Sequence, residues 1–297
     1  MSPAVLAPHE EQVQAYYDRN TQRFLRLGAS RKELSIHRAV WVAGVRTRSA
    51  ALETSSRLIL ADLENFASRL AGEPVHILDL GCGVGGTLFF LARNFPGPLK
   101  ASGITLSPLQ ARLAMDYARQ LKLDGICTFH TGSYLDLPPL PPADLAIGVE
   151  SFSLGPDPAR FFRSAASALR PGGRLLLIDD FLSSRAAAGM VHPRQHQWIS
   201  AFQKGWHANS LLTPQQVSAF GGQAGLHLDK DRDLTPFLHL LTLRDCFVAL
   251  ILSFGRLLPL RALLTHDYLD SLRGGNALQH GLRKGIFEYH QFTFTKS

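Results

Sequence analysis

The sequence has little of what marks disulfide-stapled, zinc-binding or membrane-spanning proteins. Its 297 residues include 3 cysteines, Cys82, Cys127 and Cys246, which are widely separated and form no CxxC pair. An odd number of distant cysteines argues against a disulfide framework and against a structural metal site. The longest apolar run, residues 246–254, is too short to cross a bilayer and is soon followed by Arg256. We therefore expect a protein of a reducing compartment without a membrane span.

Dense basic runs and a recognisable leader segment are also lacking. The net charge is +7 and the isoelectric point is about 9.6, but the positive charges are spread along the chain. Nucleic-acid-binding arms concentrate such charges, so we expect no nucleic-acid partner. Residues 1–12, MSPAVLAPHEEQ, lack the apolar core of a signal peptide. These features predict a cytoplasmic protein with a small-molecule substrate; they leave its oligomeric state open, and a homo-oligomer is compatible with them.

The composition that remains is that of a folded globular protein, with 45% hydrophobic and 19% charged residues. Hydrophobic periodicity predicts helices at the start of the chain, the third of them over residues 49–70, and then strands that alternate with helices. The strands are expected at residues 75–80, 100–105, 125–131, 143–149, 174–178, 226–231 and 287–294. This rhythm predicts a Rossmann-like, doubly wound α/β fold with a mostly parallel, seven-stranded sheet. Ligands of such sheets bind outside the carboxyl ends of the strands.

The regular alternation is preceded and interrupted by helical segments. Residues 1–72 are expected to form an N-terminal helical lid, and residues 73–297 form the α/β domain. Two insertions, residues 182–207 and 235–284, carry amphipathic helical patterns and are expected to form a cap over the substrate.

The stretch VHILDLGCGVGG, residues 75–86, combines a buried strand with a glycine-rich turn. Glycines at such a turn let a ligand approach the backbone closely. Their spacing fits the dinucleotide pattern G-x-G-x-x-G. Asp79 with Gly81, Gly83 and Gly85 also fits the D-x-G-x-G-x-G form of S-adenosylmethionine (SAM)-dependent methyltransferases. Asp79 favours the second form, because a carboxylate beside the turn repels a pyrophosphate but accepts an ammonium group.

Three motifs together make residues 75–180 resemble class I SAM-dependent methyltransferases. LDLGCGVGG is followed by GITLSPLQ at residues 103–110 and by LRPGGRLLLIDD at residues 169–180. The Pro-Gly-Gly turn before the fifth strand is characteristic of that family. A NAD-binding protein needs an acid roughly 20 residues past the glycines, where this chain has Thr105. The GIT-L-S-x-x-Q variant is similar to the cyclopropane-synthase, tocopherol and prenyl-diphosphate branches of the family.

The resemblance implies SAM as the cofactor and assigns residues to it. The implied cofactor-binding residues are Asp79, Gly81, Gly83, Gly85, Thr105, Gln110, Ser133 and Tyr134. The glycines would lie against the cofactor, Asp79 would hold its amino group, and Thr105 and Gln110 would lie near the ribose. Ser133 and Tyr134 occupy the usual adenine edge. Many relatives have an acid at the position of Ser133, so an ordinary turn residue is the alternative there.

The N-terminal pattern YYDRNTQRFLRLG with IHRAVW, residues 16–41, resembles bacterial C-methyltransferases that act on prenyl diphosphates and other terpenoids. The implied substrate-binding residues are Tyr17, Arg26, His37, Arg38 and Trp41. Arginine can hold a diphosphate through bidentate contacts, although a solvated basic helix face is the alternative for each residue. The sequence has no complete set of metal ligands, so Mg²⁺ would enter such a site only on the phosphates of the substrate.

Methylation of an alkene carbon leaves a carbocation, which needs electron-rich rings nearby and a base that removes a proton. Glu150 directly follows the fourth strand, where a carboxylate is rarely needed for packing. Trp198, Phe202 and Trp206 are spaced four residues apart and share one face of a predicted helix. We predict Glu150 as the base and the three aromatic residues as the groups that stabilise the cation. A buried core stripe is the alternative for the aromatic residues.

Three other functions are compatible with the sequence to different degrees. An O- or N-methyltransferase with an apolar or aromatic acceptor would use the same fold and cofactor, with the aromatic side chains only lining the pocket. A SAM-binding protein without methyl transfer would keep the cofactor motifs. A NAD-dependent oxidoreductase is disfavoured by Thr105 and by the Pro-Gly-Gly turn.

Overall fold

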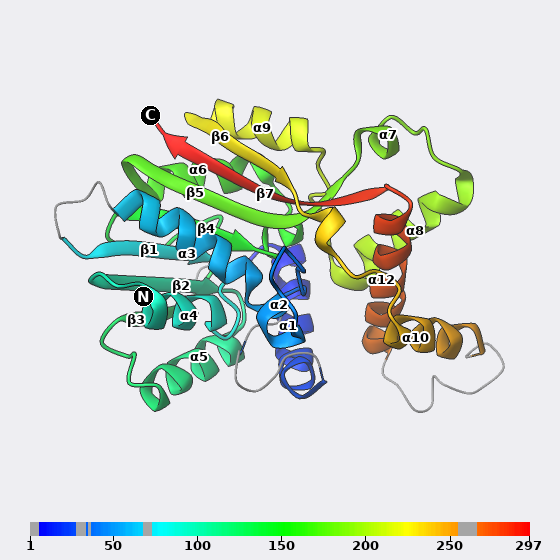
Figure 1. Cartoon of the computed structure of the whole chain (residues 1–297), viewed down its shortest axis with the longest axis horizontal. Helices are drawn as coiled ribbons and strands as arrows, with labels where there is room; N and C mark the ends of the chain where they lie inside the picture. The colour runs from blue at the N-terminus through cyan, green and yellow to red at the C-terminus, as the bar shows by residue number, and fades with distance from the viewer. Residues whose placement is uncertain (1–5, 28–33, 35–36, 68–72, 255–265) are drawn as a thin grey trace.

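The computed structural model describes residues 6–27, 34, 37–67, 73–254 and 266–297. In this part of the chain seven strands form one sheet with helices on both of its faces (Figure 1). The strands are β1 (Val75–Leu80), β2 (Leu99–Thr105), β3 (Cys127–Thr131), β4 (Ala143–Val149), β5 (Leu169–Leu182), β6 (Leu226–Asp233) and β7 (Phe287–Lys296). Their order is β3-β2-β1-β4-β5-β7-β6, and β7 runs antiparallel to both of its neighbours. The predicted fold class is confirmed.

Helices precede the sheet, connect its strands and extend beyond it. They are α1 (Pro8–Leu27), α2 (Arg48–Leu52), α3 (Thr54–Ala67), α4 (Gly86–Asn94), α5 (Pro108–Gln120), α6 (Pro158–Ala168), α7 (Ser184–Ala187), α8 (Pro193–Trp206), α9 (Pro214–Gln223), α10 (Leu243–Phe254) and α12 (His266–Arg283). Short 3-10 turns η1 (Phe152–Leu154) and η2 (Thr235–Phe237) complete the described elements.

The sheet is buried at its centre and exposed to solvent at one edge. Every residue of β4 is buried, as expected for a parallel strand that is covered on both faces. Apolar side chains alternate between two cores: Ile77 packs with α3, α4 and α5, whereas Leu78 packs with α6 and α9. In the edge strand β6 only Leu226 is buried, and the following residues, most of them charged, alternate between exposed and half-buried.

The strand order reverses at β1, which lies between β2 and β4. The loops that follow β1 and β4 therefore leave the sheet on opposite sides and open a crevice at the carboxyl ends of these strands. Asp79 pairs in register with Gly103 of β2 and Ile147 of β4, next to this crevice. The topology thus brings the glycine turn and the residues after β4 to one place.

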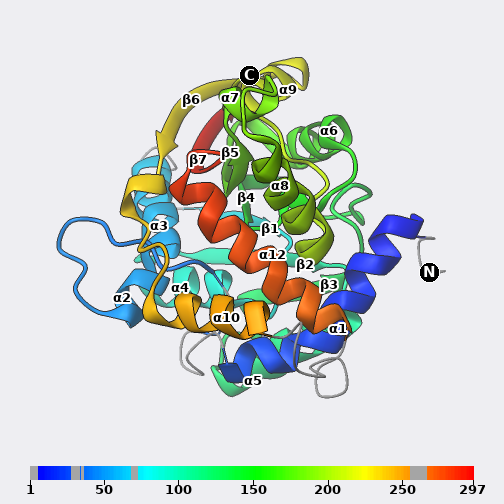
Figure 2. The same cartoon turned by 90° about the vertical axis from the view of Figure 1, so that its right-hand side faces the viewer.

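A layer of helices, α8, α10 and α12, lies beyond the strand ends, with α1 beside it (Figures 1 and 2). Helices α8, α10 and α12 come from the two predicted insertions. The backbones of α8 and α12 approach closely, because a Cβ atom on Gly205 would overlap the Asp270 carbonyl oxygen. Glycine is required at this crossing for packing.

The N-terminal region differs from the predicted run of helices. Residues 37–47 form an extended strap, in which Val40 pairs as a β-bridge with Leu238 and the Trp41 amide donates to the Phe237 carbonyl at 2.7 Å. The expected helix over residues 49–70 is divided into α2 and α3, with Thr54 donating its hydroxyl to the Val40 carbonyl at 2.8 Å. The end of that expected helix, residues 68–70, lies outside the described residues.

The fifth strand also begins earlier than predicted. Leu169 already pairs with Ala143, so Pro171-Gly172-Gly173 lies within β5 as an irregularity and not before it. The irregularity has a local cause, because Gly172 has a φ of 74° and the pairing register shifts between Ala143 and Leu145.

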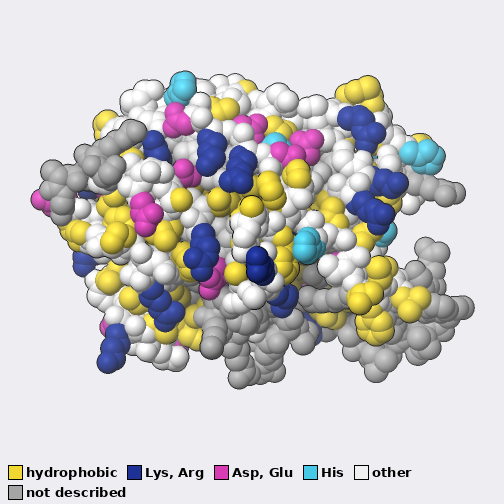
Figure 3. Space-filling view, in the orientation of Figure 1, with side chains coloured by type: hydrophobic (Ala, Val, Ile, Leu, Met, Phe, Trp, Pro, Cys, Tyr) yellow, Lys and Arg dark blue, Asp and Glu magenta, His cyan; other side chains and the backbone are white. Residues whose placement is uncertain are grey.

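The surface carries scattered charges and a few exposed apolar side chains. On the face in Figure 3, lysine and arginine side chains are spread out and do not form one patch. Leu243, Phe247 and Leu250 on α10 are exposed. Among the described helices, none combines the length and apolar character that crossing a bilayer requires. In the described part of the chain, no three histidine, cysteine or acidic side chains are grouped so that they could hold a metal ion.

Candidate active site

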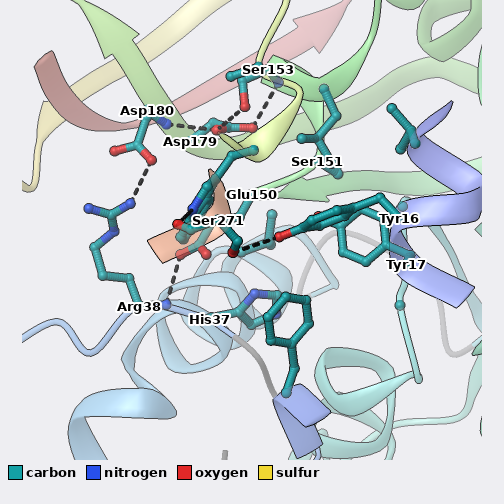
Figure 4. Close-up of a pocket in the computed structure, with 18 of the residues that line it drawn as sticks. Tyr16, Tyr17, His37, Arg38, Glu150, Ser151, Ser153, Asp179, Asp180 and Ser271 are labelled. Carbon is teal, nitrogen blue, oxygen red and sulfur yellow. Dashed lines mark hydrogen bonds and ion pairs between the residues drawn. The ribbon is translucent and has the colours of Figure 1, made fainter. Parts of the chain in front are cut away.

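A cavity of about 460 Å³ lies at the carboxyl ends of the central strands. Its floor is formed by the loops that follow β1, β2, β3 and β4 and by Asp179 and Asp180 of β5, and its walls by α1, the strap of residues 37–39, α8 and α12. Figure 4 shows that acidic side chains from the strand ends and tyrosines from α1 face the same space. The cavity occupies the crevice where the strand order predicts a ligand.

The glycine turn after β1 contributes an open cradle to this cavity. A Cβ atom on Gly81 would overlap Ser151, and one on Gly85 would lie 2.7 Å from the Phe129 ring, so packing explains both glycines. Gly83 differs, because it has a φ of 54° and a Cβ atom there would meet no atom within 4 Å. Gly81 and Gly83 line the cavity, whereas Gly85 lies under aromatic rings. The space at Gly83 fits a ligand that lies against the backbone.

Asp79 lies behind the cavity wall and is 3% exposed. Burial raises the pKa of its carboxyl to about 8. A buried carboxylate is stable only with a nearby positive charge, and otherwise it takes up a proton. An ammonium group beside the glycine turn would supply that charge, so this carboxyl fits the amino group of SAM.

Helix α1 latches onto the loops after β2 and β3 through polar side chains. Ser133 donates its hydroxyl to Glu10. Gln110 donates to the Thr21 hydroxyl at 3.0 Å and accepts from the Thr105 hydroxyl at 2.7 Å. The side chains predicted to lie near ribose and adenine therefore line the cavity and also bond within the protein. These hydrogen bonds make α1 part of the site.

Glu150 is held in an unusual conformation at the end of β4. Its φ is +50°, which is uncommon outside glycine and occurs where surrounding structure fixes it, often at functional sites. Oε1 of the carboxylate accepts hydrogen bonds from the Arg38 backbone amide and from the Tyr289 hydroxyl, both at 2.8 Å. The strap and the last strand thus fix the same carboxylate oxygen. This carboxylate is pre-positioned on the cavity wall.

The Glu150 carboxylate and its two donors, the Arg38 amide and the Tyr289 hydroxyl, form a clamp. A second set of charged groups surrounds it. The Arg38 guanidinium pairs with Asp180 at 2.6 Å and lies 4.9 Å from the centre of the Tyr289 ring. Burial raises the pKa of Asp180 to about 7 and that of Asp179 to about 6. Within the described part of the chain, Nε and Nη1 of Arg38 and Oδ1 of Asp180 are buried without a hydrogen-bond partner. Both residues belong to the cavity wall, so these unsatisfied groups lie just behind its surface.

The other predicted substrate and aromatic residues divide into two groups. Tyr17, His37, Phe202 and Trp206 line the cavity together with Arg38. His37 Nε2 lies 2.9 Å from the Thr87 hydroxyl, and burial lowers its pKa, so the ring is neutral.

Two predicted aromatic residues stack elsewhere. Trp41 stacks on His239 with ring centres 4.4 Å apart, and Trp198 stacks on His280 at 5.5 Å. The three aromatic residues of α8 therefore do not act as one stripe, because only Phe202 and Trp206 reach the cavity. Arg26 belongs to α1, and its side chain lies outside the described residues.

Sequence reasoning missed two residues in or next to the clamp, Asp180 and Tyr289. Asp180 lies just past the predicted end of the fifth strand at the carboxyl edge of the sheet, the same signal that identified Glu150, so it was within reach of the sequence. Tyr289 carries no such signal, because its place beside Glu150 depends on the antiparallel pairing of β7 with β5, in which Tyr289 lies opposite Asp180.

Comparison with known proteins identifies the family. Residues 77–173 match the family model described as "Methyltransferase domain". The chain is 31% identical over 204 residues to 27-O-demethylrifamycin SV methyltransferase of Amycolatopsis mediterranei (strain S699), which covers 68% of this chain and 70% of that protein. It is 36% identical over 103 residues to the chloroplastic tocopherol O-methyltransferase of Arabidopsis thaliana, covering 34% of this chain and 29% of that protein.

The fold extends the likeness over the whole chain. A geranyl diphosphate C-methyltransferase from Streptomyces coelicolor A3(2), solved in complex with Mg²⁺, geranyl diphosphate and S-adenosyl-L-homocysteine, superposes with a TM-score of 0.67. The two sequences are 20% identical, and the superposition covers 99% of this chain and 100% of that one. The sequence motifs, the crevice with its glycine cradle and these relatives agree: the chain belongs to the class I SAM-dependent methyltransferases.

Proposed function

We propose that the protein is a C-methyltransferase of specialised metabolism that methylates an alkene carbon of a prenyl diphosphate. The observation that carries the proposal is the clamped carboxylate of Glu150 inside a cavity walled by aromatic rings. When bound, SAM supplies an electrophilic methyl group at the glycine cradle. The protein's own groups then have to orient the acceptor, exclude water, stabilise a cation and remove a proton.

Glu150 is suited to the proton transfer. Both of its donors reach Oε1, which leaves Oε2 as the oxygen that takes the proton from the methylated acceptor. Loss of that proton lets the carbon–hydrogen electron pair re-form the double bond. A base that is already fixed in place avoids the entropy cost of orientation during the reaction.

Aromatic rings on three sides of the cavity support the cationic step. Tyr17 of α1, Trp206 of α8 and Tyr268 of α12 line it. A cation near the face of such a ring gains about 0.5 to 2 kcal/mol, and more in a site without water. These residues are the cation-stabilising groups of the proposal, and Trp198 is not among them.

The diphosphate in this proposal lies toward the basic side chains of the wall. Arg23 lines the cavity with its guanidinium 4.4 Å from the centre of the Tyr268 ring, and neutral His37 lies nearby on the strap. Arginine is the residue best matched to phosphate oxygens. Mg²⁺ enters the proposal as a cation carried on these phosphates.

An O- or N-methyltransferase with an apolar acceptor is the second candidate. The two curated relatives named above are O-methyltransferases. In addition, Oδ1 of Asn276 on the cavity wall is buried without a partner among the described residues and would accept a hydrogen bond from an acceptor hydroxyl. In that case Glu150 would orient the acceptor and no carbocation would form.

The test is a mass-spectrometric assay with SAM and isopentenyl, geranyl and farnesyl diphosphates, each with and without Mg²⁺. The proposal predicts a product that is heavier by one methylene and retains its diphosphate. Binding of SAM without methylation of any diphosphate would contradict the proposal. A phenol or hydroxylated polyketide that is methylated on oxygen under the same conditions would then establish the second candidate.

A further inference from the structure

Helix α12 contains two adjacent glycines, Gly274 and Gly275, in its interior. Glycine is among the least favourable residues in a helix, because it loses the most backbone freedom on folding. Each of the two positions therefore calls for a physical reason. The surroundings of the two glycines give different reasons.

Gly274 is explained by the crossing of α8 and α12. A Cβ atom at this position would lie 2.8 Å from Cδ1 of Trp206 and 3.1 Å from the Cα atom of Gly205. Real side chains essentially never come so close, so any larger residue would push the two helices apart. Packing within the protein requires glycine here.

Packing does not explain Gly275. A Cβ atom there would meet only Trp206, at 3.7 to 4.0 Å, which is ordinary van der Waals contact. Gly275 and the Trp206 indole both line the cavity, whereas Gly274 is not one of the residues on its wall. The missing side chain at Gly275 thus leaves room in the cavity and not between the helices.

The wall beside this room is fixed. The Trp206 indole nitrogen donates to the Ser271 carbonyl of α12 at 3.1 Å, and its ring packs against Phe202 with centres 5.9 Å apart. The indole therefore cannot easily swing aside to make space for a larger residue at position 275. Any atoms added there would be subtracted from the volume that a ligand can fill.

We propose that Gly275 is a specificity-determining position, which keeps open the part of the cavity beside Trp206 that receives the apolar tail of the acceptor. That the tail is a prenyl chain rests on the function proposed above. The size limit itself applies to any elongated acceptor. Longer side chains at this position shift the preference toward shorter acceptors.

The test compares Gly275→Ala and Gly275→Leu with the wild type on isopentenyl, geranyl and farnesyl diphosphates. Because the protein tolerates a Cβ atom here and alanine favours helix, Gly275→Ala should melt at or above the wild-type temperature. Its kcat/KM should fall about tenfold for the longest acceptor that the wild type uses and stay unchanged for the shortest. Gly275→Leu should extend the loss to the acceptor of intermediate length.

Gly222 supplies the matched control. It lies in α9, is exposed, and a Cβ atom there would meet nothing within 4 Å. Gly222→Ala and Gly222→Leu should leave the ranking of acceptors as it is in the wild type. A folded Gly275→Ala that keeps both wild-type stability and the wild-type ranking of acceptors would overturn the inference, even if Gly275→Leu fails to fold.

A binding experiment separates this inference from the proposed reaction. If the wild type methylates no prenyl diphosphate, the affinity of n-alkyl phosphates of increasing chain length is measured by calorimetry in the presence of S-adenosyl-L-homocysteine. The inference predicts that wild-type affinity increases with chain length and that Gly275→Leu loses this increase. A wild-type affinity that is independent of chain length, or an unchanged dependence in Gly275→Leu, would overturn it.

Discussion

The sheet side and the helix side of the cavity are built on different principles. On the sheet side, strand register and a glycine turn place backbone atoms, and a single open position, Gly83, makes the cradle. On the helix side, room depends on side-chain size where α8 and α12 cross, as at Gly275 beside Trp206. The room on the sheet side is thus set by backbone geometry, whereas on the helix side it is set by the size of single side chains.

The carboxylate of Glu150 stands between the two sides. It ends a central strand, yet its two hydrogen-bond donors come from residues 112 and 139 positions away in the sequence. The clamp therefore depends on contacts of the strap and of the last strand with segments that are distant in the sequence. Variants on the sheet side, on the helix side and at the clamp test whether the two sides have these separate roles.

The largest effect is expected from Glu150→Gln. The amide keeps an oxygen that can accept the two hydrogen bonds but cannot take a proton, so kcat for carbon methylation should fall roughly 10² to 10⁴-fold. The affinity for SAM should stay as in the wild type, since the cradle is unaffected. Steady-state formation of the methylated product measures the first quantity and calorimetry the second. Glu53→Gln, at a surface ion pair with Arg57, is the control and should be fully active.

The next largest effect is expected for Gly83→Ala compared with Gly189→Ala. Both glycines have positive φ, 54° and 72°, and open space for a Cβ atom, so both variants incur a backbone cost of about 1 to 2 kcal/mol. Gly83 lines the cavity and Gly189 lies in an exposed turn. The two variants should lose similar stability in calorimetry, but the affinity for SAM should fall about tenfold only in Gly83→Ala. Equal affinities would remove Gly83 from the cofactor site.

An intermediate effect is expected from Tyr289→Phe. This variant removes one donor to Glu150 and keeps the ring beneath Arg38. A hydrogen bond to a charged group contributes about 1.5 to 3 kcal/mol, but the Arg38 amide still holds the same oxygen, so only part of this is lost and kcat should fall about fivefold while KM stays constant. Steady-state kinetics on the preferred acceptor measure both. Tyr117→Phe on α5 is the control, and a change in KM alone would show that Tyr289 shapes the pocket without positioning the carboxylate.

The last effect acts through pH, on stability and cofactor binding and not on the chemical step. Burial raises the pKa of Asp79 to about 8 in the folded protein, above its ordinary value of about 3.9 in an unfolded chain. The contribution of this proton to stability is fully present below about pH 4 and is lost as the pH rises through about 8. Without SAM, the melting temperature of the wild type relative to Asp79→Asn should therefore decrease from pH 4 to 8.

SAM should reverse this trend at the upper end, because its ammonium group favours the ionised carboxylate. We expect the affinity of the wild type for SAM to increase as the pH approaches 8 and that of Asp79→Asn to stay flat. Calorimetric titrations in buffers of different ionisation enthalpy would also detect release of the Asp79 proton on binding. Asp179 and Asp180 titrate in the same range in both proteins, so the difference between the curves isolates Asp79.

The sequence predicts the sheet side well and the helix side poorly, for a physical reason. Buried parallel strands are continuous apolar runs, and β4 begins and ends at the predicted residues. The turn after β1 is equally predictable, since all of its glycines lie within residues 81–86. Trp198 and Trp206 share a helix and a predicted face, but their different partners, His280 and the cavity, depend on how α12 crosses α8.

The strap shows the same limit of prediction from sequence. His37, Arg38 and Trp41 are close in sequence, and the first two reach the cavity while Trp41 stacks on His239. Their extended course follows from the bridge between Val40 and Leu238, a pairing between distant segments that periodicity does not encode. Long-range pairing of this kind also explains why Tyr289 could not be predicted.

The most direct test of the account is the fate of the acceptor's hydrogen. A prenyl diphosphate with deuterium on its alkene carbons and on all carbons next to them is incubated with the protein and SAM, and the mass of the product is measured. Carbon methylation followed by proton removal by Glu150 predicts a product that gains one methyl group and loses one deuterium. A methylated product that retains every deuterium would contradict carbon methylation and place the methyl group on a heteroatom.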